Sequence, residues 1–370
     1  MFPSHDPRID FTNDTKGHLL LEPSRTNLLE RSNEFDNSYW GKQNVTVTAN
    51  SAISPDGTNN AFLLDVGTAD DDHSLRKTNV TPTATYAVSI FAKKGSTDYV
   101  WFVCGGSSRG VQAIFDLSDG SVTDSGTVGS GQTLVAAKSV DMGNGWYRLI
   151  MEAETTSAPT NNLTITPYYQ DTFSGNITTS WQGNNETIYI YGAMNEEGSF
   201  ATSYIPTTGA TATRNADVCN NSGSAQDFNS EEGVVYAEIA ALIETAGATK
   251  QFTVSGSTTD NQIKFTFKNT ANQVNFSLKS NGSTEVNLLH TISPVITNFF
   301  KIAFKYKVND CALWVNGTEV ATDTSAAMPL DLSSLQFDRG DGGNDFNGKI
   351  RNLQVFTEAL TDEQLEKLTS

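Results

Sequence analysis

The side chains best suited to bind a ligand are three aromatic rings in one part of the chain. Trp181 lies in a loop-like stretch rich in amides, and Tyr168 and Tyr169 lie nearby in sequence. Aromatic faces stack on the apolar side of pyranose rings, and amides or carboxylates frame the sugar by hydrogen bonds. The pattern predicts a sugar-binding site with Trp181 exposed; the alternative is ordinary core packing. Three other tryptophans lie in strand-like runs and are predicted to be core residues: Trp101, Trp146 and Trp314.

A second group that could do chemistry is a set of carboxylates in a glycine-rich loop. Asp338, Asp341 and Asp345 lie within eight residues that also include three glycines. Clustered carboxylates on a loop can bind Ca²⁺, although the spacing does not match an EF-hand loop. The sequence therefore predicts a possible Ca²⁺ site at these three residues, and the alternative is that they are solvated turn acids. No other cofactor is expected.

The sequence contains a catalytic motif, but the elements predicted around it are not those that its chemistry requires. Gly106–Gly110 matches the Gly-x-Ser-x-Gly nucleophile elbow, which requires a strand before the serine and a helix after it. The residues that follow, Val111–Leu117, alternate between apolar and polar positions as a strand does. A glycine-rich hairpin is therefore the better interpretation. We expect the protein not to be an enzyme.

Charge limits the classes of partner. The chain has 370 residues, with 24 Lys and Arg against 42 Asp and Glu, which gives a formal net charge of −18. Such a surface repels nucleic acid and acidic membranes. No stretch reaches the apolar length of a membrane span, so membrane insertion is not expected either.

The elements that must position these residues are predicted to be strands. Phe300, Ile302, Phe304 and Tyr306 alternate with lysines, and Trp314–Val315 runs into Asn316–Gly317, a strong hairpin signal. The last residues differ, because Thr361 and Gln364 form a capping box that predicts one short helix. The sequence predicts an all-β chain with two β-sandwich (jelly-roll) domains in tandem. Their predicted bounds are 34–215 and 216–370, after an N-terminal arm or attachment segment over residues 1–33.

Several segments resemble those of phage tail-fibre, head-fibre and other virion-surface proteins. They are Leu20–Leu28, Phe35–Trp40, Ser54–Thr58, Asn144–Arg148, Gly192–Pro206 and Thr213–Asp217. The domain between these segments resembles jelly-roll carbohydrate-binding modules. The C-terminal block resembles laminin-G or concanavalin-A-like lectin domains, through Ala312–Gly317 and Phe346–Ile350.

These resemblances imply a structural protein on the surface of a phage particle. The implied partners are other virion proteins of the capsid or tail, a host-surface glycan or receptor, and further copies of the chain in a homotrimer. Two alternatives stay open. One is a purely architectural capsid decoration or tail joint protein, and the other is the binding region of a carbohydrate-active enzyme.

Overall fold

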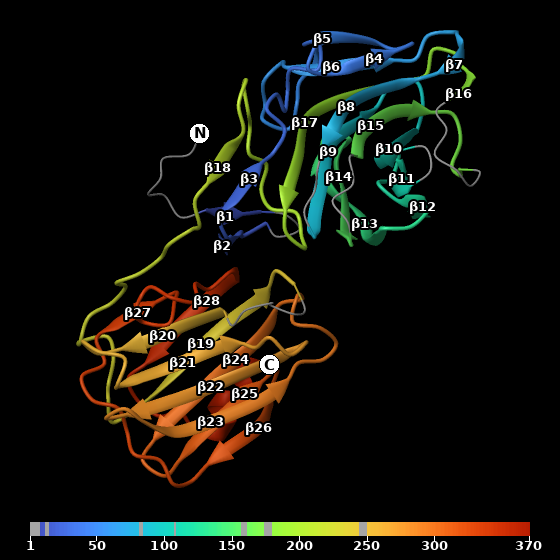
Figure 1. Cartoon of the computed structure of the whole chain (residues 1–370). Coiled ribbons are helices and arrows are strands. Elements are labelled where there is room, and N and C mark those ends of the chain that lie inside the picture. Colours follow the sequence, from blue (N-terminus) through green and yellow to red (C-terminus); the bar gives the residue numbers. More distant parts are fainter. Residues whose placement is uncertain are drawn as a thin grey trace. The chain divides into compact units, whose positions relative to one another are not determined.

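The computed structural model describes residues 8–11, 15–80, 84–106, 109–156, 161–173, 180–243 and 250–370. They form two compact units, one from residues 24–215 and the other from residues 1–23 together with 216–370 (Figure 1). Within the described ranges the regular structure is β-strand apart from one helix, α1 (Asp362–Thr369). The prediction of an all-β chain with two sandwiches and a short C-terminal helix is therefore confirmed. Over the same ranges, no helix has the length and apolarity to cross a membrane.

The unit of residues 24–215 is a sandwich of two antiparallel six-stranded sheets. The strands of the first sheet are β4 (Gly41–Gln43), β8 (Ser74–Val80), β10 (Tyr99–Gly106), β11 (Arg109–Asp116), β12 (Val122–Val128) and β15 (Asn161–Tyr168). Those of the second are β5 (Thr46–Ala52), β6 (Ala61–Asp65), β9 (Thr85–Lys94), β13 (Gln132–Gly143), β14 (Trp146–Thr155) and β17 (Thr187–Glu197). The spatial orders are β12-β11-β10-β15-β8-β4, here the β10 sheet, and β13-β14-β9-β17-β6-β5, here the β9 sheet. Two short pairs flank them: β3 (Arg25–Asn27) with β18 (Ala212–Arg214), and β7 (Asp70–Asp72) with β16 (Ser180–Gln182).

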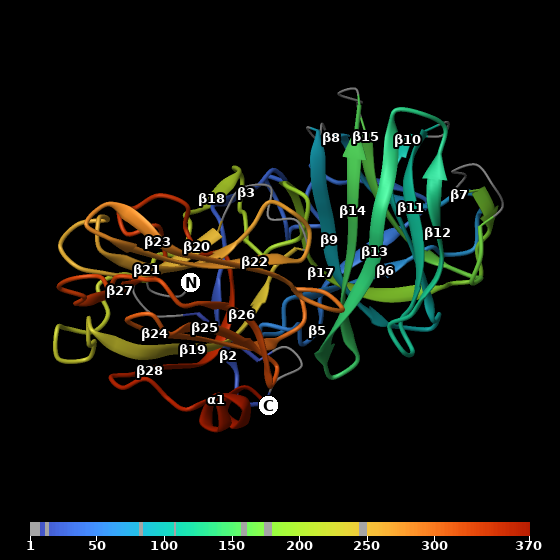
Figure 2. The same cartoon turned by 90° about the horizontal axis from the view of Figure 1, so that it is seen from below.

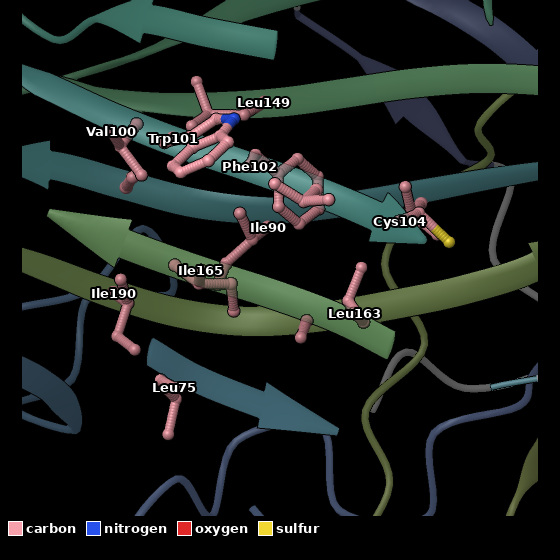
Figure 3. Packing of buried hydrophobic residues seen from close by; sticks show 14 of the residues in the cluster. Leu75, Ile90, Val100, Trp101, Phe102, Cys104, Leu149, Leu163, Ile165 and Ile190 are labelled. Atoms are coloured by element: carbon pink, nitrogen blue, oxygen red, sulfur yellow. The ribbon is translucent and has the colours of Figure 1, made fainter. Parts of the chain in front are cut away.

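The core of this unit lies between the two sheets. Ile90 and Leu149 come from the β9 sheet, and Phe102 and Ile165 come from the β10 sheet (Figure 3). All four side chains are fully buried, and each such burial contributes about 1.5–3 kcal/mol. Because successive side chains of a strand point to opposite faces, the residues between these core positions project from the outer faces of the sheets.

The other unit is a sandwich of a seven-stranded and a five-stranded sheet. The larger sheet contains β1 (Ile9–Asp10), β2 (His18–Leu21), β19 (Glu232–Ala241), β24 (Phe300–Lys307), β25 (Cys311–Val315), β26 (Thr318–Asp323) and β28 (Gly348–Phe356). The smaller sheet contains β20 (Lys250–Ser255), β21 (Gln262–Phe267), β22 (Gln273–Ser280), β23 (Ser283–Thr291) and β27 (Ser334–Gln336). The spatial orders are β1-β2-β28-β19-β24-β25-β26, here the β19 sheet, and β23-β22-β21-β20-β27, here the β21 sheet.

Phenylalanines fill the space between these two sheets. Phe276 of β22 stacks on Phe304 of β24, with ring centroids 5.0 Å apart and planes inclined by 11°. On the outer side of the β19 sheet, Leu365 of α1 packs in a cluster with Tyr236 and Trp314 (Figure 2). The capping box at Thr361 that starts this helix is present as predicted.

The N-terminal residues differ from the separate arm predicted over residues 1–33. β2 pairs with β28 within the β19 sheet, while β3 pairs with β18 in the other unit. The backbone N–H of Leu28 also donates to the carbonyl of Asn195 (2.8 Å). The described part of this segment is therefore divided between the two sandwiches. Sequence patterns miss this arrangement because each short strand is stabilised by a partner far away along the chain.

Candidate functional site

The structure brings the three predicted aromatic rings together. Tyr168 ends β15 and Trp181 is the central residue of β16. The ring centroids of Tyr168 and Trp181 are 5.2 Å apart with planes at 87°, and those of Tyr169 and Trp181 are 5.6 Å apart at 40°. Tyr168 and Tyr169 also contact each other, at 4.8 Å. We call Tyr168, Tyr169 and Trp181 the aromatic cluster.

A fourth ring supports the cluster from the outer face of the β10 sheet. Phe102 faces the core, so its neighbour Trp101 projects outward, where its ring lies 5.1 Å from that of Tyr168. The indole N–H of Trp101 donates to Oε1 of Gln112 (3.1 Å), which holds the ring in place. Trp101 is fully buried, as predicted for it, but the sequence did not connect it with Tyr168. Only the strand register reveals that connection.

Burial within the cluster is the reverse of what the sequence predicts. Trp181 was expected to be exposed, yet only 9% of its surface is accessible, and Tyr168 is similarly buried. Tyr169 is the accessible ring, with 48% of its surface exposed. Trp181 is covered because Tyr168 and His73 pack against it, the latter with ring centroids 4.8 Å apart.

Polar groups lie beside the rings. Trp181 pairs with Asp71 in the β7–β16 ladder, so the two side chains share a face, and Asp71 is exposed. The buried Nε1 of Trp181 has no hydrogen-bond partner among the described residues. Burial raises the pKa of Tyr168 to about 12, so its hydroxyl stays protonated at neutral pH. The site thus combines one open ring face with a carboxylate acceptor and an unused indole donor.

His73 anchors the base of this site. It is fully buried, and its ring nitrogens lie 3.0 Å from the carbonyl oxygen of Asn44, 3.1 Å from that of Ala69 and 3.0 Å from that of Trp181. The ring thus lies between the backbone of β16, the loop before β7 and Asn44. His73 therefore positions Trp181, a role that the sequence did not indicate.

The three loop carboxylates for which a Ca²⁺ site was predicted do not lie together as one group. Asp338 is buried, with its oxygens accepting from the amide of Asn220 (2.9 Å) and from the backbone N–H of Gly340 (2.5 Å). Asp341 pairs with the guanidinium of Arg339 instead, with Nη2 2.8 Å from Oδ2. Among the described residues, no group of three His, Cys, Asp or Glu side chains is arranged to hold a metal ion. Asp338 and Asp341 are thus engaged in local bonds, and Asp345 does not join them in a metal-binding group.

The described residues of the Gly-x-Ser-x-Gly motif lie at the end of β10 and at the start of β11. β10 and β11 pair antiparallel up to Gly106 and Arg109, so a strand follows the motif, as predicted. Ser107 and Ser108 themselves lie outside the described residues. A strand, β11, thus begins at Arg109, where a nucleophile elbow requires a helix.

Comparison with known proteins identifies part of the C-terminal sandwich. Residues 240–366 match the family model described as the concanavalin A-like lectin/glucanases superfamily. This match spans less than half of the chain, and it establishes the unit that contains it as a lectin-like β-sandwich. No curated protein matches the chain.

Solved structures with similar parts are distant. The Ruminococcus gnavus IT-sialidase CBM40 bound to alpha2,3 sialyllactose is 18% identical; the match covers 41% of this chain and 94% of that one, with a TM-score of 0.34. The leech intramolecular trans-sialidase is 20% identical, covering 41% and 26% of the two chains, with a TM-score of 0.33. The binding domain of Botulinum neurotoxin serotype D is 14% identical, covering 42% of each chain, with a TM-score of 0.32. Likenesses this distant carry no argument about the ligand.

Proposed function

We propose that this chain is a non-enzymatic, glycan-binding structural protein on the surface of a phage particle, in a tail or head fibre. The observation that carries the glycan-binding role is the aromatic cluster, where the accessible ring of Tyr169 lies beside Trp181. A pyranose requires an apolar ring face with hydrogen-bonding groups at its edge, and Asp71 is placed to provide one. The lectin-like match of residues 240–366 is consistent with this role.

The virion location is supported by the segments that resemble virion-surface proteins, such as Gly192–Pro206. The partners would be capsid or tail proteins, a host-surface glycan, and two further copies of the chain in a homotrimer. Labelling of intact particles with an antibody against the chain, together with the native mass in solution, tests this part. Unlabelled particles and a monomeric mass at micromolar concentration would contradict it.

The glycan-binding part is tested with a glycan array followed by affinity measurements on the best ligand. Tyr169→Ala should weaken binding roughly 2- to 12-fold, because an aromatic contact contributes about 0.5–1.5 kcal/mol. Tyr169→Phe should keep most of the affinity, since it retains the ring. Trp181→Phe keeps a ring but removes the indole N–H, so it isolates the contribution of that donor.

Tyr189→Ala is the matched control, because Tyr189 lies on the outer side of the β9 sheet between the core residues Ile188 and Ile190. It should leave the affinity unchanged. An array without hits, combined with a tight complex with a capsid or tail protein, would replace the proposal with a purely architectural role. Release of reducing sugar from a bound glycan would refute the non-enzymatic part.

A further inference from the structure

The outer face of the β21 sheet is polar throughout its central strands. Phe252, Ile263, Phe265 and Phe276 face the core, so the residues between them project outward. The outward residues of the three central strands, β20 to β22, are Gln251, Thr253, Ser255, Gln262, Lys264, Thr266, Asn275, Ser277 and Lys279. Hydroxyl and amide groups are thus placed side by side around two lysines.

Lys264 lies at the centre of this face. In the strand register it stands between Thr253 of β20 and Ser277 of β22, and Lys279 lies diagonally beside it, opposite Gln262. Neither lysine forms an ion pair with any residue in the described part of the chain. On the β19 sheet, by contrast, Lys305 pairs with Asp310 (2.7 Å) and Lys307 with Glu232 (2.9 Å). In a chain with 42 acidic and 24 basic residues, adjacent lysines without acidic partners stand out.

The charges around Lys264 are mainly positive. Burial lowers its pKa, and Lys279, Arg339 and Lys268 lower it further. Asp341 acts in the opposite direction, but both of its carboxylate oxygens are bound by the guanidinium of Arg339. The charge of Arg339 is thus paired with Asp341, whereas Lys264 and Lys279 form no ion pair with a carboxylate in the described part of the chain. Since the Debye length is about 8 Å at physiological ionic strength, this local charge outweighs the net charge of the chain.

Buried acceptors without partners flank the lysine. Gln262, two residues before Lys264 on β21, is 2% exposed, and its Oε1 has no hydrogen-bond partner among the described residues. The Oε1 of Gln251 on β20 also has no hydrogen-bond partner among the described residues, and Gln251 is 6% exposed. A buried acceptor without a donor is costly, and a ligand hydroxyl group would remove that cost. The face thus offers cations for an anionic group and acceptors for hydroxyls.

We propose that the outer face of the β21 sheet binds an acidic sugar, with Lys264 and Lys279 contacting its carboxylate, sulfate or phosphate group. The Oε1 atoms of Gln251 and Gln262 accept from its hydroxyls. This site extends the proposed glycan-binding role to the other sandwich. It shares no residue with the aromatic cluster.

The test measures the affinity of the full chain for matched sugars by calorimetry: one neutral oligosaccharide and its carboxylated, sulfated and phosphorylated forms. At least one acidic form should bind more tightly than the neutral form, and its binding should weaken with salt. Lys264→Met should reduce that affinity roughly 10- to 100-fold, because a hydrogen bond to a charged group is lost. Lys264→Arg should keep most of it. The acidic form that binds most tightly identifies the anionic group.

Lys307→Met is the matched control, because it removes one positive charge from the β19 sheet. It should leave the affinity for the acidic sugar unchanged. Equal affinities of wild type and Lys264→Met, or an equal loss in Lys307→Met, would overturn the inference. If only a neutral sugar binds, and Tyr169→Ala weakens that binding, this inference fails while the proposed function stands. If no sugar binds at all, both fail.

Discussion

Replacing Lys264 with methionine should stabilise the ligand-free protein. A site that concentrates positive charge for a ligand has a cost when the ligand is absent, since Lys264 is half-buried beside Lys279 without an acidic partner. Methionine removes the charge but keeps an unbranched apolar chain over the neighbouring strands. The substitution therefore removes the repulsion between the two lysines and keeps the packing of the side chain.

The expected gain follows from the register of β21 and β22. Diagonal neighbours on a sheet are about 7–8 Å apart, and two unit charges at that distance repel by roughly 0.5–1 kcal/mol at an effective dielectric constant of about 40–80. Release of Lys264 from burial adds to this value. We expect Lys264→Met to raise the free energy of unfolding by about 1 kcal/mol at low salt.

Urea unfolding of the C-terminal sandwich, at about 20 mM and about 500 mM salt, measures this effect. Salt screens the repulsion, so the wild type should gain stability with salt and Lys264→Met should gain less. Lys307→Met removes the partner of Glu232 and should be no more stable than the wild type at either salt concentration. A destabilised Lys264→Met, or one with the salt dependence of the wild type, would refute the repulsion.

The comparison of the wild type with Lys264→Met also predicts how their difference in stability changes with pH. The folded protein holds the pKa of Lys264 below its ordinary value. At a pH between the pKa of Lys264 in the folded protein and its pKa in the unfolded chain, the unfolded chain therefore binds more protons than the folded protein. Stability of the wild type relative to Lys264→Met should therefore rise as the pH increases through that window towards 10.5. A difference that stays constant up to pH 10.5 would show that Lys264 is not the titrating group.

Three further predictions concern other parts of the chain. His73→Ala should lower stability by about 1–3 kcal/mol and change the fluorescence of Trp181, because the buried ring that contacts the carbonyls of Asn44 and Trp181 is removed; an unchanged emission spectrum would contradict this role. Leu21→Ala should cost about 2–4 kcal/mol in the C-terminal sandwich, because this buried residue of β2 belongs to its core; an effect confined to the other sandwich would contradict the strand assignment. A chelator should leave the melting temperature unchanged, because Asp338 and Asp341 already have protein partners; a clear decrease would restore the Ca²⁺ site.

Local patterns were sufficient for most of the fold. The alternation of Phe300–Tyr306 with lysines predicts β24, and Asn316–Gly317 predicts the hairpin into β26, where both residues have positive φ (45° and 79°). The helix start at Thr361 was readable in the same way. These features depend on neighbours within a few residues, so the sequence contains what they require.

The candidate sites depend on contacts between distant residues, which local sequence patterns do not predict. Tyr168, Tyr169 and Trp181 are close enough in sequence to predict a common site, but their exposure depends on His73, which precedes Trp181 by more than a hundred residues. Sequence reasoning therefore found the group and selected the wrong ring as the exposed one.

The three aromatic residues that could contact a sugar were thus determined by the sequence alone, whereas the order of their burial was decided by the tertiary structure. The same division applies to Lys264 and Lys279. Each is visible in the sequence as an ordinary lysine on the polar side of a strand, and only the register of β21 and β22 places them side by side without a carboxylate. Charge and stacking act over a few ångströms in space, and the sequence specifies distance only along the chain.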